Sequence, residues 1–547
     1  MRLQNVTAIL SMLHEPPGAG GGTGARNSAT RRFRGEPVLA WTLSRVARAA
    51  HVTDIAVICW EDQRADVAPI AEAGAHVLVK DPRVPMPEVE AVAAARRWAD
   101  GWRGGLLSTC DFDLGFHGPW HWEVAAELDS DAVLLIDPSA GLVDPALLDK
   151  LVEQAKRHEQ VEICFCPAAC GLGAALLRPA LLSRLSAARA HPGRLLHYLP
   201  DQLSREPLAG DGCVPVATTV ARTTGLFTLD SDRQIERIER ATVSLNGELI
   251  TSDAEAIVHR VHAEHGTDAL PREVVLELNT TRQARPIYWA GRHLEISRAP
   301  MPLDRVVALL DELSGADDLR LTLAGVGDPL LSPDVFSVIE AAASRGIRSI
   351  HVETDLSGVN GEQVKRLARA PIDVVSVHLP ALTAGMYEAV MGLKVYPLVL
   401  DNIRAFVSER QALGRRLPLI VPVFTKCSRN LIEMEAWYDT WLRALGCAVI
   451  AGPTDCAGQV PDAAVADMSP PKRTPCARIE SRMTVLCDGR VVSCEQDVLG
   501  AQVMGEVGKQ PVREIWQQSF GKLRAWHREG RWSQLTLCGQ CREWHRP

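Results

Sequence analysis

The sequence contains no long apolar run and no excess of basic charge. A membrane-spanning helix needs about 18 to 20 consecutive apolar residues, and no such stretch is present. Lys and Arg number 59 against 67 Asp and Glu, which gives a net charge of −8. A dedicated nucleic-acid-binding protein normally carries a basic domain. We therefore expect neither a membrane partner nor nucleic acid as a partner.

The N-terminal segment lacks the features of a secretory signal. MRLQNVTAIL has one Arg and a short apolar stretch, without the longer apolar core of a signal peptide. The 14 Cys in 547 residues are also too sparse for a secreted disulfide framework. We therefore expect a cytoplasmic location, where Cys spacing indicates metal ligands before it indicates disulfides.

Two stretches of the chain alternate short apolar runs with helical patterns, which is typical of parallel α/β folds. The first stretch includes the strand-like runs Val6–Leu10, Ile55–Cys59 and Ala132–Ile136. The second stretch contains six such runs, namely Val274–Leu278, Leu319–Ala324, Ile347–Glu353, Val374–Leu379, Leu417–Phe424 and Ala448–Ile450. An eightfold barrel takes about 250 residues, so six strands in about 180 residues favour a partial (β/α)6 barrel.

This pattern predicts four segments in an α/β protein. Residues 1–240 form an open parallel-sheet domain, and 241–270 form a charged helical connector. Residues 271–465 form the partial barrel. Residues 466–547 hold five Cys and few apolar helices, which is typical of a small domain stabilised by a metal centre.

The C-terminal Cys set is the strongest chemical signal. Cys476 is followed by Cys494, and Cys538 and Cys541 form a CGQC pair in which two thiolates can reach one metal. The segment VLCDGRVVSC predicts a hairpin that turns at Asp-Gly, a favoured two-residue turn. Four thiolates suit either a tetrahedral zinc ion or one [4Fe–4S] cluster.

The spacing C-x12-G-x4-C followed by C-x2-C resembles the SPASM domain. That domain is the auxiliary iron–sulfur domain of many radical SAM peptide-modifying enzymes. The usual domain carries two clusters and further Cys, whereas this sequence ends at Pro547. The resemblance therefore implies one [4Fe–4S] cluster, held by Cys476, Cys494, Cys538 and Cys541.

The barrel segment resembles radical SAM enzymes, with one departure. GVGDPLLSPD resembles their Gly-Gly-Glu-Pro segment, and Asp328 stands where an acidic residue contacts the amino group of S-adenosylmethionine. ELNTTRQARPIYWAG resembles the loop after the first strand, but Gln283, Ile287 and Ala290 stand where three cluster-binding Cys are expected. The resemblance implies a degenerate site without radical chemistry or S-adenosylmethionine as a cofactor, a pattern similar to that of spiro-SPASM proteins.

The N-terminal segment resembles nucleotidyltransferases of the glycosyltransferase-A type. Their first strand is followed by a Gly-rich loop that binds the triphosphate, and Gly21, Gly22, Gly24 and Arg26 hold that place here. Asp137 ends the strand whose terminal Asp holds Mg²⁺ in that family. The alternative interpretation is a surface loop at GAGGGTGARNSATRR and a simple turn at Asp137.

Two classes of function follow from these expectations. In the first, this iron–sulfur protein carries out nucleotidyl transfer, or peptide or sugar modification, through its N-terminal domain, with Mg²⁺ and a nucleoside triphosphate. In the second, it is a non-catalytic iron–sulfur binding or scaffold protein. The sequence names no specific partner among peptides, proteins and sugars, and whether the chain is an enzyme stays open because a fold does not imply an activity.

Overall fold

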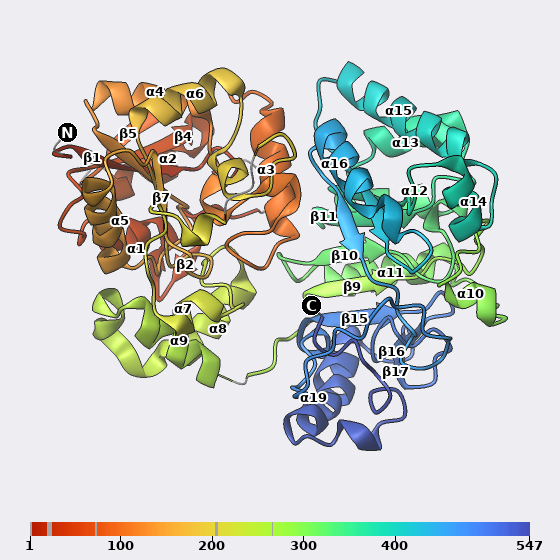
Figure 1. Cartoon of the computed structure of the whole chain (residues 1–547). Helices are drawn as coiled ribbons and strands as arrows, with labels where there is room; N and C mark the ends of the chain where they lie inside the picture. Colours follow the sequence, from red (N-terminus) through yellow and green to blue (C-terminus); the bar gives the residue numbers. More distant parts are fainter. Residues whose placement is uncertain (1–2, 19–24, 72–73, 203–205, 265, 547) are drawn as a thin grey trace. The chain divides into compact units, whose positions relative to one another are not determined.

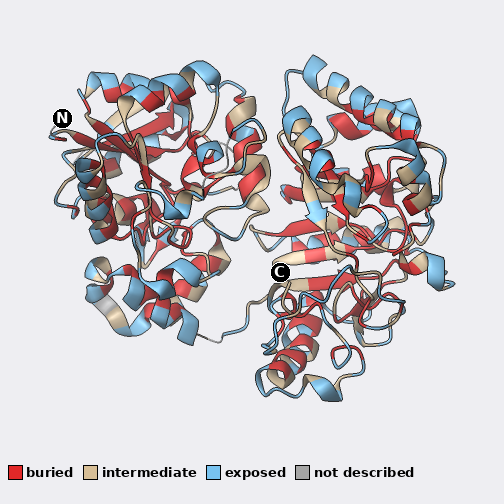
Figure 2. Cartoon of the chain, in the orientation of Figure 1, coloured by how far each residue is buried: buried red, intermediate tan, exposed pale blue. Residues whose placement is uncertain are grey.

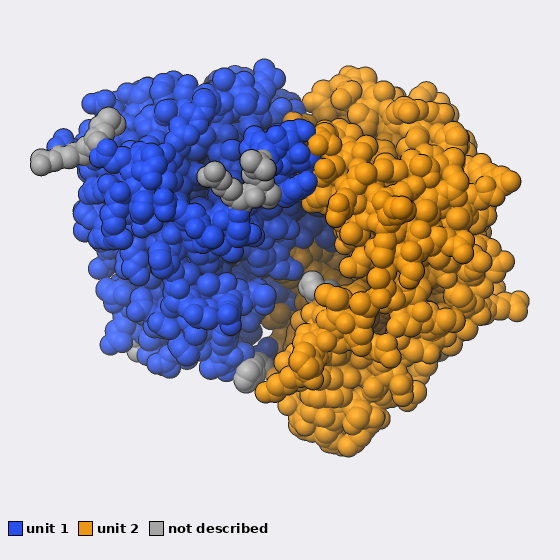
Figure 3. Space-filling view, viewed as in Figure 1, with its two compact units in different colours: residues 1–266 blue, residues 267–547 orange. Residues whose placement is uncertain are grey.

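The computed structural model describes residues 3–18, 25–71, 74–202, 206–264 and 266–546. The chain divides into two compact units, Met1–Gly266 and Thr267–Pro547, which Figure 3 shows in different colours. Each unit is built around its own large β-sheet. Within the described ranges, every helix is too short or too polar to cross a membrane.

Unit 1 contains a six-stranded sheet in the order β5-β4-β1-β6-β8-β7 (Figure 1). Four of its strands are parallel, namely β1 (Val6–Ser11), β4 (Asp54–Trp60), β5 (His76–Lys80) and β6 (Ala132–Ile136). Strands β7 (Ile163–Phe165) and β8 (Ala175–Leu177) add an antiparallel edge. Every residue of β1 and β6 is buried, as expected for central parallel strands covered on both faces. The helices are α1 (Val38–Val46), α2 (Glu61–Ala71), α3 (Pro87–Arg97), α4 (Gly118–Glu127), α5 (Pro145–Arg157) and α6 (Pro179–Ala188).

The residues expected to form a connector, 241–270, belong largely to unit 1. They begin in the last turn of α8 (Asp232–Thr242), which comes after α7 (Thr218–Arg222), and they contain a 3-10 helix and α9 (Ala254–Ala263). The apolar face of α9 lies in the same buried cluster as β1 and α1. Arg45 is fully buried and donates to the carbonyls of Leu249 and Ser252, so this segment is fixed to the sheet domain.

Unit 2 contains a nine-stranded sheet in the order β14-β13-β12-β11-β10-β9-β15-β16-β17. The first six in the chain are parallel and adjacent in sequence order, namely β9 (Glu273–Leu276), β10 (Arg320–Leu323), β11 (Ser349–Thr354), β12 (Val374–His378), β13 (Leu419–Thr425) and β14 (Val449–Ala451). On the other side of β9, the sheet continues through β15 (Arg482–Val485), β16 (Arg490–Val492) and β17 (Val503–Glu506). The C-terminal segment thus shares one sheet with the barrel segment.

The two faces of the unit 2 sheet differ in polarity. Apolar strand residues such as Val274, Leu321 and Val375 are buried with five helices, which are α11 (Leu303–Leu313), α12 (Val335–Ser344), α13 (Gly361–Arg369), α15 (Tyr396–Ala412) and α16 (Met434–Leu445). The alternate positions include the polar residues His351 and His378. Figure 2 shows that the strands are largely buried and that exposed residues lie on the outer sides of the helices. The expected mixed α/β class with mainly parallel strands is confirmed.

Candidate functional site

The four predicted Cys ligands line a single cavity in the C-terminal segment. Cys476 precedes α17 (Arg478–Ser481), Cys494 follows β16, and Cys538 and Cys541 lie in the turn after α19 (Phe520–Arg528). In the part of the chain that the structure describes, no three Cys, His, Asp or Glu side chains stand close enough together to form a metal ligand set. The thiols therefore surround the cavity without converging on one point.

Burial disfavours the thiolate form of three of these residues, Cys494, Cys538 and Cys541. It raises the pKa of Cys538 to about 12, and the neighbouring thiols of Cys541 and Cys476 act in the same direction. Burial also raises the pKa of Cys541, and it raises that of Cys494 well above the ordinary thiol value. A bound metal reverses this preference, because a coordinating thiol is deprotonated outright.

His527 lies against the cavity with an unpaired nitrogen. Its side chain is buried and lines the cavity with the four Cys. Its Nδ1 accepts a hydrogen bond from the backbone N–H of Cys476 at 3.4 Å, whereas its buried Nε2 has no partner among the described residues. Burial, with a further contribution from Arg473, lowers the pKa of His527 to about 4, so the ring is neutral at pH 7.

Arg473 brings a positive charge to the same cavity. Its guanidinium lies over the rings of Trp532 and Trp544, with 5.1 and 6.0 Å to the ring centroids. One terminal nitrogen donates to the carbonyl of Cys538 at 2.8 Å. Its buried Nε, in contrast, has no hydrogen-bond partner within the described ranges. The donor set of four thiols and two unpaired N–H groups fits an iron–sulfur cluster, whose sulfur atoms accept hydrogen bonds.

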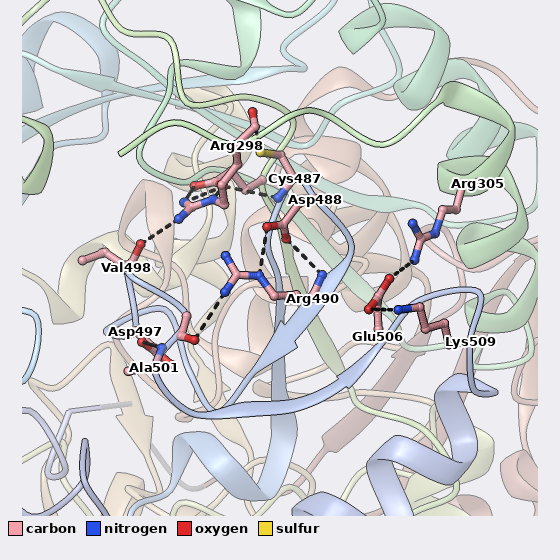
Figure 4. Close-up of polar contacts among 12 residues, drawn as sticks. Arg298, Arg305, Cys487, Asp488, Arg490, Asp497, Val498, Ala501, Glu506 and Lys509 are labelled. Atoms are coloured by element: carbon pink, nitrogen blue, oxygen red, sulfur yellow. Dashed lines mark hydrogen bonds and ion pairs between the residues drawn. The ribbon is translucent and has the colours of Figure 1, made fainter. Parts of the chain in front are cut away.

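The expected hairpin lies between Cys476 and Cys494, but it turns over the three residues 487–489 and not over Asp-Gly alone (Figure 4). The backbone N–H of Leu486 donates to the carbonyl of Arg490, and that of Gly489 donates to the carbonyl of Leu486. Gly489 has φ 91°, a left-handed conformation that glycine adopts without strain. The Asp488 carboxylate accepts from Arg490 Nε at 2.9 Å and from the Arg490 backbone N–H at 3.1 Å. These contacts fix the strand that leads into Cys494.

Cys487 lies in the same hairpin but away from the four thiols. Its backbone N–H donates to Glu277 Oε1 at 3.2 Å. Its Sγ lies 3.8 Å from the carbonyl oxygen of Arg298 (Figure 4). Glu277 and Arg298 form an almost fully buried ion pair at 2.8 Å. Cys487 therefore connects the hairpin to the barrel segment. As a buried Cys outside the cavity, it serves as a control for substitutions of the four cavity thiols.

Asp328 follows β10, where its carboxylate is buried and accepts hydrogen bonds from the protein. Its Oδ1 accepts from the backbone N–H of Leu330 at 3.0 Å. Its Oδ2 accepts from Thr354 Oγ1 at 2.8 Å and from the backbone N–H of Asp355 at 2.9 Å. Burial raises the pKa of Asp328, and the neighbouring Asp355 carboxylate adds to this effect. Both oxygens of the Asp328 carboxylate thus already accept hydrogen bonds from the protein.

Arg282 and Asp355 form a forked ion pair beside Asp328. Arg282 Nε lies 2.7 Å from Asp355 Oδ2, and the second contact joins a terminal nitrogen to Oδ1. The side chains are 7% and 1% exposed. The guanidinium also lies 3.8 Å from the centroid of the Trp289 ring. Burial alone would lower the pKa of Arg282, but the attraction of Asp355 outweighs it and raises the pKa.

The three positions where cluster Cys were expected lie in different surroundings. Gln283 lies against Gly358, where an added Cβ would be 2.9 Å from the Gln283 amide carbon. Ile287 packs with Tyr288 in one small apolar cluster, whereas Ala290 belongs to another. These side chains supply one amide and two alkyl groups, none of which ligates iron as a thiolate does.

In unit 1, Asp137 lies directly after β6 and is mostly buried. Its Oδ1 accepts from the backbone N–H of Ser139 at 2.7 Å and from the Ser139 hydroxyl. Its Oδ2 lies 3.6 Å from His14 Nε2 and has no hydrogen-bond donor in the described residues. Burial raises the pKa of the nearby Glu15 and raises that of Asp111 to about 7, and in each case the charge of Asp137 adds to the effect.

The predicted phosphate-binding residues of unit 1 are only partly described. Gly21, Gly22 and Gly24 lie outside the described residues. Arg26 forms an ion pair with Asp232, the first residue of α8, and Arg31 lies 2.9 Å from the same carboxylate. The basic groups next to the Gly-rich segment are therefore engaged by a carboxylate from the C-terminal part of unit 1.

Several site residues escaped the sequence-based prediction. Arg473 and His527 lie 3 residues before Cys476 and 11 residues before Cys538, and no motif marks them. Asp355 follows β11 in the segment HVETDLSG, so its place at a strand end was a usable signal. The same signal applies to Glu15, which follows β1 after a short turn.

Residues 476–542 match SPASM, described as an iron–sulfur cluster-binding domain. All four cavity thiols lie within this match, so the expected iron–sulfur domain is confirmed. A protein of Treponema pallidum (strain Nichols), described as "Uncharacterized protein", is 26% identical over 302 residues, which cover 52% of this chain and 81% of that protein.

The chain is also similar to solved structures at low identity. They include BtrN in complex with AdoMet and 2-DOIA, at 15% identity and TM-score 0.33, with 50% of this chain and 93% of BtrN covered. Streptococcus suis SuiB bound to the precursor peptide SuiA has 12% identity and TM-score 0.39, with 55% and 82% covered. A cytidylyltransferase from Leptospira borgpetersenii has 11% identity and TM-score 0.34, with 48% and 95% covered.

Proposed function

We propose that unit 2 is an iron–sulfur module that holds one [4Fe–4S] cluster on Cys476, Cys494, Cys538 and Cys541. The observation that carries this proposal is that these four thiols line one cavity inside the SPASM match. The thiol side chains must turn toward the cavity centre and lose their protons when the cluster binds. A bound cluster supplies one-electron redox chemistry and joins the C-terminal turn to the hairpin and to α17.

Iron and acid-labile sulfide analysis tests this assignment. After anaerobic purification, we expect about four iron and four sulfide per chain, because four thiolates complete one [4Fe–4S] cluster. Stoichiometric zinc without iron or sulfide would instead indicate a tetrahedral zinc site. A His545→Ala variant should keep its iron, because this neighbour of the C-terminal turn does not line the cavity.

We also propose that the strand ends of the barrel segment carry out no radical chemistry. The side chains of Gln283, Ile287 and Ala290 offer no thiolate. Beside Asp328, the charges of Arg282 and Asp355 are paired with each other in an ion pair. The dithionite-reduced protein should therefore not convert S-adenosylmethionine to 5′-deoxyadenosine. Formation of that product above the level of a no-protein control would contradict this proposal.

Nucleotidyl transfer by unit 1 is the second candidate function. The observation in its favour is the buried Asp137 Oδ2, which lacks a hydrogen-bond donor in the described part of the chain and lies at a sheet edge where α/β proteins bind ligands. Asp137 would hold Mg²⁺ with help from the phosphates of a nucleoside triphosphate. Release of pyrophosphate that depends on Mg²⁺, and that is lost in Asp137→Asn, would support this function.

The alternative is an iron–sulfur scaffold that binds a peptide, protein or sugar without reacting with it. The ion pairs of Arg26 and Arg31 with Asp232 favour this alternative, since they engage the groups expected to contact phosphate. Isothermal titration calorimetry with Mg²⁺ and each of the four common nucleoside triphosphates measures nucleotide binding and so distinguishes nucleotidyl transfer from the scaffold function. Absence of binding at millimolar concentration would leave the scaffold as the function of unit 1.

A further inference from the structure

We propose that His527 and Arg473 donate hydrogen bonds to the sulfur atoms of the cluster and thereby raise its reduction potential. The inference rests on the cluster assignment proposed above. Both residues line the cavity of the four thiols, and each has one buried nitrogen without a hydrogen-bond partner in the described residues. Buried polar groups in folded proteins are nearly always paired, so two unpaired N–H groups at one cavity point to an acceptor inside it.

The hydrogen bonding of His527 determines which nitrogen carries the proton. A neutral imidazole has one N–H and one acceptor nitrogen. Because Nδ1 accepts from the backbone N–H of Cys476, the proton is placed on Nε2. That Nε2–H is the unpaired group, and it is the atom available to sulfur. The same contact fixes the ring to a thiol-bearing residue, so the donor is already oriented when the cluster binds.

Arg473 is held in place by groups other than its free Nε. Two Trp rings flank the guanidinium, and one terminal nitrogen is fixed to the carbonyl of Cys538. The Nε–H and the positive charge therefore lie at the cavity at little further entropic cost. A permanent cation there stabilises the more negative state of a nearby redox group, because electrostatic interactions are strong in a buried site.

The direction of the effect follows from the electron balance. A low-potential one-electron donor transfers one electron to the oxidised cluster, which gains one negative charge, and no protein bond forms or breaks. Hydrogen bonds to sulfur and nearby positive charge stabilise this reduced state and raise the potential. Removal of either donor should shift the potential to a more negative value.

The test is a redox titration of the full-length holoprotein, followed by the EPR signal of the reduced cluster. The variants are His527→Phe, which keeps a flat ring without N–H groups, and Arg473→Met, which keeps most of the apolar stem. We expect each to lower the ratio of reduced to oxidised cluster about tenfold at a fixed potential, which corresponds to ~59 mV for a one-electron couple. His527→Gln, which retains an amide donor, should recover part of the change.

Arg528→Met is the matched control. This exposed residue is the neighbour of His527 in α19, so its substitution changes the net charge as Arg473→Met does without altering the cavity. We expect the wild-type potential. An equal shift in Arg473→Met and Arg528→Met would contradict hydrogen bonding by Arg473 and indicate a general charge effect.

Iron and sulfide content separates failure of this inference from failure of the cluster assignment. Wild-type protein without iron and sulfide would overturn the assignment, and this inference with it. Full cluster content with wild-type potentials in His527→Phe and Arg473→Met would overturn this inference alone. If His527→Phe loses its cluster, the potential of Arg473→Met decides the outcome.

Discussion

The two polar sites of unit 2 differ in how their polar groups are paired. At the strand ends, both oxygens of Asp328 accept hydrogen bonds from the protein, and Arg282 pairs with Asp355 in a fork. At the thiol cavity, Arg473 and His527 each keep a buried nitrogen without a partner among the described residues. The charged groups of Asp328, Arg282 and Asp355 are thus paired with other groups of the protein, whereas the thiol cavity has two N–H groups without an acceptor in the described residues.

This difference is the one expected between a structural polar network and a site that holds a bound group. Burial of an unpaired polar group is unfavourable, so such groups persist where a ligand or another functional need compensates for them. A fully paired buried network instead contributes to the folding of its surroundings. We therefore interpret the strand-end network of unit 2 as part of the core and the thiol cavity as the candidate cofactor-binding site.

The largest expected effect is that of cluster removal. Binding of a metal group is linked to folding, because its ligands are brought together only in the folded segment. A chelator with an oxidant should therefore loosen residues 476–542, and amide hydrogen exchange there should rise strongly while exchange in β1 and β6 of unit 1 stays unchanged. Equal protection with and without the cluster would show that the cavity is not needed for the fold of this segment.

The next effect is expected at the strand ends. Arg282→Ala leaves the buried Asp355 without its partner and beside Asp328, which should destabilise unit 2 by about 3–5 kcal/mol in denaturant unfolding. Arg366→Ala is the matched control, because Arg366 also stacks on an aromatic ring and pairs with a carboxylate but is exposed. Its cost should be about 0–1 kcal/mol. Equal costs would contradict the structural role of the buried pair.

The pH dependence of unit 2 should report on His378, whose ring contacts Trp289 at the strand ends. Burial, with a further contribution from Arg282, lowers the pKa of His378 from 6.5 to about 4. Between these values the unfolded chain binds a proton that the folded chain does not, so stability falls as the pH drops from 6.5 to 4. Each pKa unit corresponds to about 1.4 kcal/mol. His378→Gln should flatten this part of the stability profile, and an unchanged slope would contradict the prediction.

The smallest effect is expected for Arg26 in unit 1. Its ion pair with Asp232 is half exposed, so Arg26→Ala should change the stability by at most about 1 kcal/mol. If unit 1 binds a nucleoside triphosphate, the same variant loses a charge-assisted phosphate contact, which costs roughly 1.5–3 kcal/mol of binding free energy. Calorimetric titration of both proteins therefore distinguishes a phosphate ligand from a purely structural ion pair.

Local structure was predictable where one residue pattern dominates. Periodic apolar residues mark the helices Pro145–Arg157, Leu303–Leu313 and Gly361–Arg369 in the sequence. Each of the six expected parallel strands of unit 2 matches an observed strand within about three residues at either end. The continuation of the sheet from β9 to β15 was not predictable, because it joins residues about 200 positions apart and leaves no local pattern.

The candidate site was predictable only in part for the same reason. The four Cys could be identified from the sequence, because metal-binding Cys occur at short, characteristic spacings. The cavity donors Arg473 and His527 act through three-dimensional proximity, and isolated Arg and His residues occur throughout the chain. The expectation that Gln283, Ile287 and Ala290 stand in place of cluster-binding Cys came from the sequence, whereas the ion pair of Arg282 with Asp355 required the fold.

The most direct test compares two buried Cys of the same segment, Cys538 at the cavity and Cys487 at the barrel contact. Both are changed to Ala, and iron and sulfide are measured after anaerobic purification. We expect Cys538→Ala to lose the cluster and Cys487→Ala to keep wild-type iron and sulfide. Retention of the full cluster by Cys538→Ala, or its loss from Cys487→Ala alone, would contradict the assignment of the thiol cavity as the iron–sulfur site.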